Sequence, residues 1–210
     1  MDPKSRVAVI TGGAAGIGLA AAKLLAASGA RLVIADIDSA AGAAAVREIE
    51  ASGGEACFVH TDVTRRGNLE KMLDFAVQRF SRVDIVDNNA GISEIGRGFL
   101  APGSRFWEKT LVMDLETVIR GTQLAVQQLR RQGGGDVIIN TASMGGLIPM
   151  AMSPVCAASK AGVIHFTRSL TLRTRASVSM SSAQRLPVRR WLARTATKSS
   201  SRCSRRSLAC

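Results

Sequence analysis

The stretch VAVITGGAAGIGLAAAKLL, residues 7–25, decides the fold. Its first five residues form an apolar run typical of a buried strand, and its last part has the spacing of a helix. A glycine-rich turn joins the two. A strand, a glycine turn and a helix N-terminus in this order form a site where backbone N–H groups bind a pyrophosphate. We therefore expect a βα unit of a nucleotide-binding sheet, with a purely structural turn as the alternative.

Three glycines of this turn have separate roles. Gly12 allows a tight turn, Gly16 lets the backbone approach a phosphate, and Gly18 lets the helix pack closely on the strand. These roles predict that the turn binds the phosphates of a dinucleotide.

The second apolar run ends in Asp36, about twenty residues after the turn. A carboxylate there can accept hydrogen bonds from both hydroxyls of a ribose, and it repels a 2′-phosphate. No Lys or Arg occupies residues 12–22 or 35–41 to offset that repulsion. The sequence therefore predicts NAD rather than NADP. The alternative role of Asp36 is to cap the next helix, which Asp38 or Ser39 could do instead.

Short apolar runs alternate with longer amphipathic stretches as far as about residue 172. Strands are predicted at 7–11, 31–36, 56–60, 83–88 and 136–141, and helices near 17–28, 39–52, 66–80, 104–131 and 155–172. Apolar strands joined by helices favour parallel pairing with helices on both faces. The predicted fold class is an α/β, doubly wound parallel sheet of the Rossmann type.

Composition indicates where the charge lies and which partners to expect. Residues 1–172 hold 18 Lys and Arg against all 16 Asp and Glu, whereas 173–210 hold ten Lys and Arg and no acid. The net charge of +12 thus belongs mainly to a basic, Ser- and Arg-rich tail. No apolar run is long enough to span a membrane, and the four cysteines do not form a disulfide framework or a metal site. We expect a soluble, cytoplasmic protein with no membrane partner and no bound metal.

Several motifs in order give this chain a resemblance to the classical short-chain dehydrogenases/reductases. Residues 11–18, TGGAAGIG, resemble the family's TGxxxGxG fingerprint, and NNAG at 88–91 resembles its segment after the fourth strand. The resemblance covers residues 6–172 and implies an oxidoreductase that transfers hydride between a nicotinamide coenzyme and a secondary alcohol or ketone. The coenzyme-binding positions that it implies are Thr11, Gly12, Gly16, Ile17, Gly18, Asp36, Asp62, Val63, Asn89, Ala90, Gly91 and Lys160.

The resemblance also implies a catalytic set, and this chain departs from it twice. Ser143 matches the serine that holds the substrate oxygen, and Lys160 matches the lysine that binds nicotinamide ribose and lowers the pKa of a catalytic tyrosine. The tyrosine position is Cys156, and the chain contains no tyrosine at all. The family's asparagine in the long helix is Asp114. We expect impaired proton transfer, because a thiol falls roughly 4 Å short of where a phenolic oxygen would be.

Nucleophilic thiol chemistry is a weaker interpretation of Cys156. It requires a base, and His165 lies nine residues further on, on the opposite face of the predicted helix. His60 ends a different predicted strand and is interpreted as structural.

The tail from about residue 173 has no sustained strand or helix period, so we expect the C-terminal strands of the family to be missing. We expect residues 1–172 to form an incomplete NAD-binding domain and 173–210 a disordered or out-of-frame tail. The codons for residues 180–186 can encode Val-Ile-Cys-Pro-Ala-Phe in a shifted frame, which suggests a frameshift near residue 172. Without the later strands the sheet would keep an unpaired edge.

The sequence leaves three candidate functions. The first is an NAD-linked dehydrogenase with an impaired active site, and the second is an inactive NAD-binding protein. The third, a nucleic-acid binder that uses the basic tail, is disfavoured because Trp191 is the tail's sole aromatic residue. The family usually forms homo-oligomers, but the altered tail makes assembly doubtful here. The substrate itself is not predicted.

Overall fold

The computed structural model describes residues 3–93, 99–100, 103–133, 137–171 and 177–182, with the backbone alone for Thr171 and for 177–182. Six parallel strands form one sheet in the order β3-β2-β1-β4-β5-β6. Their bounds are β1 Val7–Thr11, β2 Arg31–Asp36, β3 Glu55–His60, β4 Ile85–Asn88, β5 Val137–Ala142 and β6 Ser177–Ser182. The predicted doubly wound parallel sheet is confirmed.

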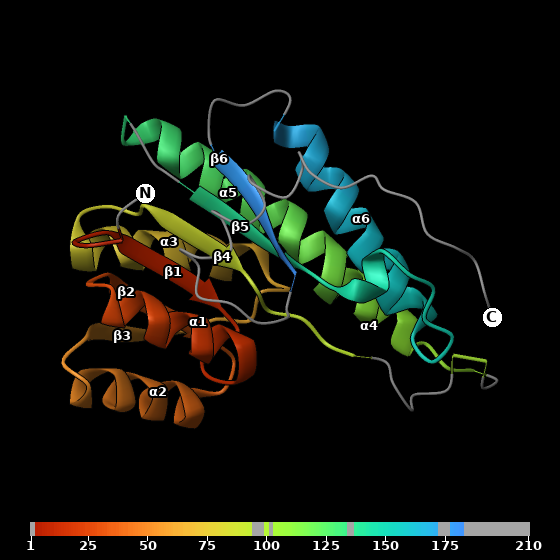
Figure 1. The fold of residues 1–210 in the computed structure, drawn as a ribbon, viewed down its shortest axis with the longest axis horizontal. Coiled ribbons are helices and arrows are strands. Elements are labelled where there is room, and N and C mark those ends of the chain that lie inside the picture. Colours follow the sequence, from red (N-terminus) through yellow and green to blue (C-terminus); the bar gives the residue numbers. More distant parts are fainter. Residues whose placement is uncertain (1–2, 94–98, 101–102, 134–136, 172–176, 183–210) are drawn as a thin grey trace, which may run out of the picture.

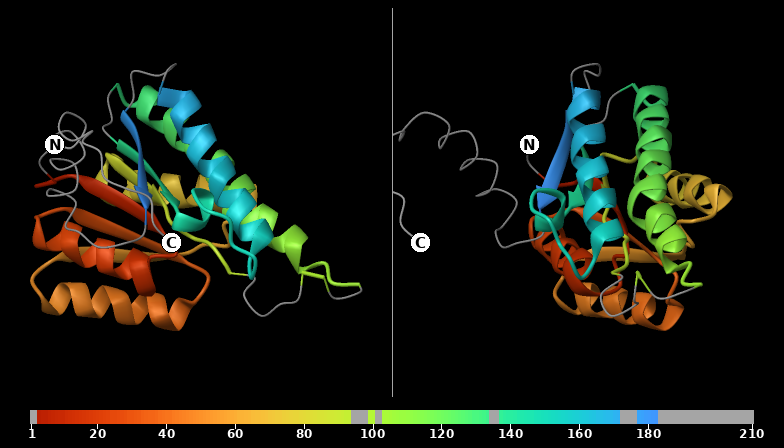
Figure 2. Two further views of the ribbon diagram at one scale, coloured as in Figure 1. Left: turned by 45° about the vertical axis from the view of Figure 1, so that its right-hand side comes forward. Right: turned by 90° about the vertical axis from the view of Figure 1, so that its right-hand side faces the viewer.

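Helices cover both faces of this sheet (Figures 1 and 2). Helices α1 and α2 lie on one face, and α3, α5 and α6 lie on the other. The helices are α1 Gly16–Ala27, α2 Ser39–Ala51, α3 Arg66–Phe80, α4 Phe106–Leu111, α5 Thr117–Arg131 and α6 Pro154–Thr171, with short helical turns η1 Val112–Glu116 and η2 Met144–Gly146.

Alternate side chains of the central strands enter two separate cores. In β1, Ala8 and Ile10 pack with α1 and α2, whereas Val7 and Val9 pack with α3 and α5. This division follows from the period of two in a strand, which sends neighbouring side chains to opposite faces. All four residues are fully buried. An uninterrupted apolar strand is therefore what a sheet covered on both faces requires.

A buried polar network crosses the second of these cores. The amide of Asn88 at the end of β4 donates to the Asn140 side chain in β5 at 2.9 Å, and Thr122 of α5 donates to the same oxygen at 3.0 Å. Asn140 in turn donates to Thr167 of α6 at 3.0 Å. The network thus fixes β4, β5, α5 and α6 relative to one another. It lies near the carboxyl ends of the strands, where open α/β sheets bind ligands.

The structure differs from the sequence expectations in two places. The helix expected over 104–131 is interrupted by the π-helical turn η1 at Val112–Glu116. The sheet also gains β6, which pairs with β5 although no strand was expected after residue 172. An open edge of β5 offers unpaired N–H and C=O groups, and this explains pairing by a segment without an apolar run.

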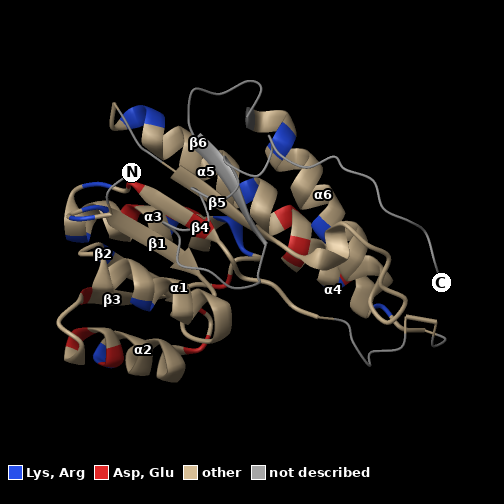
Figure 3. Cartoon of the chain, in the orientation of Figure 1, with Lys and Arg blue, Asp and Glu red and all other residues tan. Residues whose placement is uncertain are grey.

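The remainder of the tail, 183–210, lies outside the described residues, so the expectations of disorder, of a shifted frame and of no nucleic-acid partner stay predictions. Acidic and basic side chains are mixed on α2, α3 and α4, whereas α1, α5 and α6 contain Lys or Arg but no Asp or Glu (Figure 3). None of the helices in the described ranges is long and apolar enough to cross a membrane.

Candidate coenzyme and active site

The glycine turn after β1 has the geometry that the sequence predicted for each glycine. Gly12 has φ +63° and Gly16 has φ +54°, both in the left-handed region that favours glycine. A Cβ at Gly18 would lie 2.2 Å from the carbonyl oxygen of Gly12, so α1 can approach β1 only because residue 18 has no side chain. A Cβ at Gly16 would meet nothing within 4 Å, so this part of the turn faces open space.

The N-terminus of α1 fits a phosphate. Its N-cap residue, Ala15, makes no side-chain hydrogen bond, and the first turn contains no acidic residue. The N–H groups at this end carry partial positive charge and have no intrahelical acceptor. The exposed Ile17 lies in the same turn. The turn therefore fits the pyrophosphate of a dinucleotide, whose oxygens would accept hydrogen bonds from these N–H groups.

Two residues connect this turn to the segment after β4. The hydroxyl oxygen of Thr11 accepts hydrogen bonds from the backbone N–H groups of Asn89 at 3.0 Å and Ala90 at 3.1 Å. The Asn89 side chain donates back to the carbonyl oxygens of Thr11 and Gly12, at 3.0 and 3.2 Å. Because these bonds join the ends of two neighbouring strands, the glycine turn and the NNAG segment form one rigid wall.

Asp36 closes β2 beside the glycine turn. Its carboxylate accepts from the backbone N–H of Ala14 at 3.1 Å and from that of Asp38 at 3.1 Å. The capping alternative does not hold, because the N-cap of α2 is Asp38, whose side chain accepts from Ala41 N at 2.9 Å. Asp36 is half-buried at the edge of the turn. Its place fits a carboxylate that binds the adenosine ribose.

Asp62 and Val63 follow β3, as expected for residues near an adenine ring. The hydroxyl of Thr64 donates to the Asp62 carboxylate at 2.6 Å, and Arg65 forms an ion pair with it at 3.3 Å. The Thr64 hydrogen bond lowers the pKa of Asp62, and the nearby charge of Arg65 lowers it further. Val63 is buried in the core. Asp62 is thus ionised and fixed in orientation at neutral pH.

A cleft of about 390 Å³ opens beyond the carboxyl ends of β4 and β5. It brings together the four predicted catalytic residues and part of the predicted coenzyme site. Its lining is Ile17, Asn89, Gly91, Ile92, Ser93, Asp114, Thr141, Ala142, Ser143, Met150, Ser153, Cys156 and Lys160. Its volume lies in the range of small-molecule sites.

The thiol of Cys156 and the carboxylate of Asp114, the two predicted departures from the family's catalytic set, contact each other. The Sγ of Cys156 donates to Oδ2 of Asp114 at 3.4 Å, and the other carboxylate oxygen accepts from Ile92 N at 2.8 Å. Asp114 is fully buried and lies in the π-helical turn η1. A π-turn bulges out of the regular helix, and such turns are frequent at functional sites. Asp114 is therefore held in the cleft, where its oxygen faces the thiol.

Lys160 lies one helical turn after Cys156 and is almost fully buried. Its Nζ donates to the carbonyl oxygen of Thr141 at 3.0 Å. A Cβ at Gly91 would lie 3.0 Å from Oδ1 of Asp114 and 3.4 Å from the lysine Nζ. Glycine at position 91 therefore leaves room for the ammonium and the carboxylate on either side of the backbone.

The remaining predicted residues are Ser143 and the two histidines. Ser143 is half-buried, and its oxygen accepts from Gly145 N at 3.2 Å, which caps the short turn η2. His165 is exposed and does not line the cleft, as its helical phase predicted. His60 is exposed at the end of β3. Among the described residues, no three His, Cys, Asp or Glu lie close enough to hold a metal ion.

Sequence reasoning missed two polar residues at this site. Ser153, immediately before α6, is fully buried, and within the described ranges its hydroxyl has no hydrogen-bond partner. Asp87 is a buried carboxylate on β4 that accepts from the Thr141 hydroxyl at 3.3 Å. Burial raises the pKa of Asp87 from 3.8 to about 7. The signal for Asp87 was an acid inside an otherwise apolar strand, whereas no sequence signal distinguished Ser153.

Comparison with known proteins identifies the family. The sequence profile described as "short chain dehydrogenase" matches residues 6–184. The chain belongs to this family. The match extends past the expected boundary at residue 172 and includes β6. Short-chain dehydrogenases are oxidoreductases, so the chain belongs to an oxidoreductase family.

Named relatives agree with this assignment. Human (Homo sapiens) 15-hydroxyprostaglandin dehydrogenase [NAD(+)] is 36% identical over 176 residues, which cover 82% of this chain and 63% of that enzyme. A short-chain dehydrogenase/reductase of Burkholderia phymatum in complex with NAD has a TM-score of 0.79 at 32% identity, with 87% of this chain and 66% of that one covered. A metagenomic short-chain oxidoreductase in complex with NADP has a TM-score of 0.79 at 28% identity, with 87% and 83% covered. The chain thus spans less than two thirds of the curated human relative.

Proposed function

We propose that this chain binds NAD and transfers hydride between its nicotinamide ring and the carbon of a secondary alcohol or ketone, at a rate limited by the loss of the tyrosine. The observation that carries the proposal is the glycine turn, open at Gly16 and closed by the carboxylate of Asp36. Two of the compared proteins are named with NAD and one with NADP. Asp36 favours NAD, because its charge repels a 2′-phosphate.

The residues of the cleft have separate roles in this proposal. A bound nicotinamide would supply the hydride acceptor, and Lys160 would hold its ribose. The hydroxyl of Ser143 would hydrogen-bond the substrate oxygen. The thiol of Cys156 does not reach as far as a phenol, and its hydrogen bond is directed to Asp114. Proton transfer to the substrate oxygen then needs an intervening water, which slows the reaction.

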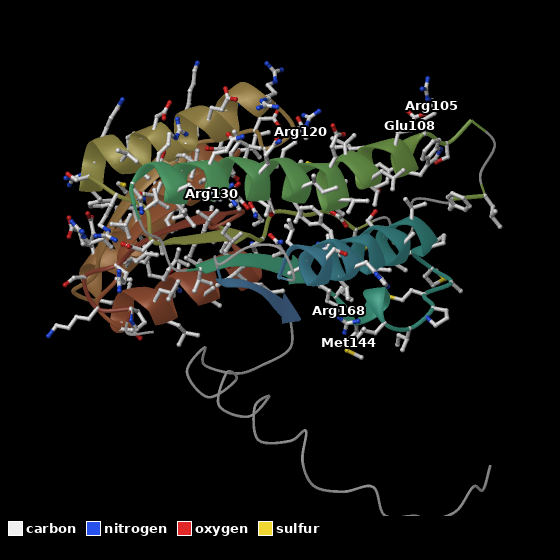
Figure 4. All side chains as sticks on the ribbon, turned by 90° about the horizontal axis from the view of Figure 1, so that it is seen from above. Arg105, Glu108, Arg120, Arg130, Met144 and Arg168 are labelled. Atoms are coloured by element: carbon white, nitrogen blue, oxygen red, sulfur yellow. The ribbon has the colours of Figure 1, made fainter. Side chains whose placement is uncertain are left out.

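The outer part of the cleft favours an apolar substrate. Met150 lines it, and beside it the segment after η2 exposes Leu147, Ile148 and Met152. Met144 extends outward from the same edge of the molecule (Figure 4). We infer a secondary alcohol or ketone with a substantial hydrocarbon part, because burial of these side chains by the substrate removes apolar surface from water.

Replacement of Cys156 tests the proposal. Cys156→Tyr restores a phenol beside Lys160 and is expected to raise the turnover of apolar secondary alcohols with NAD⁺ by about 10²-fold or more. Cys156→Phe is the matched control, since it fills the same space without a hydroxyl and is expected to give no gain. Turnover is measured as NADH formation, and NAD⁺ binding is measured in parallel by calorimetry.

The alternative is an NAD-binding protein without catalysis. It predicts binding of NAD⁺ by the natural chain and by both variants, with no turnover in any of them over a broad alcohol panel. If calorimetry detects neither NAD⁺ nor NADH binding to folded protein, both functions are wrong.

A further inference from the structure

The cleft contains a thiol, a base for it and a buried hydroxyl that has no hydrogen-bond partner among the described residues. Oδ2 of Asp114 is the acceptor of the Cys156 hydrogen bond at 3.4 Å, and the Ile92 N–H fixes the orientation of that carboxylate. A thiol nucleophile needs such an adjacent base. The sequence disfavoured thiol chemistry because His165 lies on the opposite face of α6. In the structure the base is Asp114, which comes from η1.

The position of Cys156 on its helix also favours negative charge on the sulfur. α6 begins at Pro154, and the Ser153 carbonyl accepts the first helical hydrogen bond from Ala157 N at 3.0 Å. Cys156 is therefore in the first turn of an 18-residue helix. The N–H groups of a first turn stabilise a thiolate. Their effect opposes the repulsion between a thiolate and the Asp114 carboxylate.

Ser153 is an independent indication that a ligand with a polar atom enters this part of the cleft. Its hydroxyl is fully buried and lines the cleft one helical turn before Cys156. Within the described ranges of the chain this hydroxyl has no hydrogen-bond partner. A buried hydroxyl without a partner is unfavourable, and a ligand oxygen beside the thiol would satisfy it.

We propose that Cys156 is the nucleophile of a second activity, the NAD-linked oxidation of apolar aldehydes through a covalent thioester. This proposal rests on the proposed function for its coenzyme. Cys156 lines the cleft of about 390 Å³, where the aldehyde would bind. A ketone adduct would carry no hydrogen on the reacting carbon, so only an aldehyde can be oxidised in this way.

The reaction balances with the residues present and NAD⁺. Sγ of Cys156 bonds to the aldehyde carbon, its proton passes to Asp114, and the carbonyl π electrons move to oxygen, which takes that proton to give a thiohemiacetal. The C–H bond then breaks, and hydride reduces NAD⁺ while the O–H proton returns to Asp114 and C=O forms again. The carbon is oxidised by two electrons. Asp114 then releases its proton to solvent, and water hydrolyses the thioester to a carboxylic acid and regenerates the thiol. Ser153 donates to the substrate oxygen during both steps.

The test uses the full chain, hexanal and NAD⁺. We expect NADH formation together with a hexanoyl group on the peptide that contains Cys156, detected by mass spectrometry and removed by hydroxylamine. Cys156→Ser is expected to abolish the acyl group, and Asp114→Asn to slow its formation by at least tenfold. Ser153→Ala is expected to raise the hexanal concentration that gives half-maximal acylation of Cys156 by about tenfold.

A second measurement separates this proposal from the proposed function. Without NAD⁺, hexanal is expected to slow the alkylation of Cys156 by iodoacetamide at least threefold. Cys57 serves as an internal control, since burial raises the pKa of its thiol to about 11 and keeps it unreactive. If NAD⁺ binds but hexanal neither protects Cys156 nor acylates it, the thiol activity is wrong and the proposed function stands. If NAD⁺ does not bind, the proposed function and the NAD-linked oxidation are both wrong, whatever the protection assay shows.

Discussion

The Thr141 hydroxyl donates to the buried carboxylate of Asp87 at 3.3 Å, while the Thr141 carbonyl accepts from Lys160 at 3.0 Å. One residue of β5 thus connects the acid inside the sheet to the ammonium of the cleft. Asp87 is paired in the sheet with Ile10 on β1 and Ile139 on β5, so its side chain lies among apolar neighbours. This environment favours the neutral carboxyl.

Stability is therefore expected to fall with rising pH. Burial raises the pKa of Asp87 from 3.8 to about 7 in the folded chain. Between these values the unfolded chain releases the proton that the folded chain keeps, so the free energy of unfolding decreases from about pH 4 to pH 7 and is then level. The decrease attributable to this group is up to about 4 kcal/mol.

Asp87→Asn removes the titration and retains an acceptor for Thr141. We expect this variant to lose most of the difference in unfolding free energy between pH 5 and pH 8, measured by urea titration. Asp74, on α3 rather than inside the sheet, provides the control variant Asp74→Asn. Equal pH dependence in the natural chain and in Asp87→Asn would contradict the argument.

Gly18→Ala is expected to weaken NAD⁺ binding by at least tenfold. The new Cβ would lie 2.2 Å from Gly12 O and 2.6 Å from Nδ2 of Asn89, so α1 must move away from β1. Such overpacking also lowers the free energy of unfolding by about 1–3 kcal/mol. Calorimetry and urea titration measure the two effects.

The matched control is Gly67→Ala in α3, where a Cβ would meet no atom within 4 Å. Its stability should be unchanged or raised by about 0.5 kcal/mol, because alanine is the better helix former. Unchanged affinity in Gly18→Ala would show that the turn does not bind the coenzyme.

Asp36→Ala is expected to lower NAD⁺ affinity by about 10–100-fold, since hydrogen bonds from ribose hydroxyls to a carboxylate are lost. NADP⁺ affinity is expected to rise in the same variant, because the repulsion of the 2′-phosphate is removed. The preference between the two coenzymes, measured by calorimetry, should therefore change by more than either affinity alone.

The neighbouring Asp38 separates coenzyme binding from helix capping. Asp38→Ala removes the N-cap of α2 and is expected to lower stability by about 1 kcal/mol with no change in either affinity. A loss of coenzyme preference in Asp38→Ala, and none in Asp36→Ala, would show that Asp38 and not Asp36 contacts the ribose.

The parts of the fold that sequence reasoning predicted are those whose cause is local. The β1 strand, the glycine turn and α1 follow from an apolar run, from backbone angles that favour glycine, and from helical spacing. The positions of Asp36 and Lys160 follow from their distances along the chain to these elements. Cys156 and Lys160 lie on one helix face because four residues are about one turn.

The features that sequence reasoning missed depend on tertiary contacts. The π-helical turn at Val112–Glu116 has no sequence signature, yet it places Asp114 against Cys156. Strand β6, whose sequence is SVSMSS, pairs because the edge of β5 is available, and its own pattern does not predict it. That the Ser153 hydroxyl has no hydrogen-bond partner in the described part of the chain is visible only when its surroundings are known.

Asn140 is expected to be the most sensitive buried polar position near the site. Its side chain accepts from Asn88 and Thr122 and donates to Thr167, so Asn140→Ala removes one hydrogen bond from a buried side chain on each of β4, α5 and α6. Of their side-chain bonds within the described ranges, Asn88 and Thr122 keep only the one to each other, at 3.2 Å. Each buried group left unpaired costs about 1–3 kcal/mol, so the free energy of unfolding should fall by about 3 kcal/mol or more. Urea titration at pH 6 measures this loss.

Thr110→Val is the control for Asn140→Ala, because Thr110 is fully buried and its hydroxyl donates to Phe106 O within its own helix. Its loss should be below about 1 kcal/mol, since valine keeps the shape and one local bond is removed. NAD⁺ affinity should also fall in Asn140→Ala and not in Thr110→Val, because the network holds the ends of β4 and β5 that carry the NNAG segment and Thr141. Equal losses in the two variants would mean that the network adds no rigidity to the site.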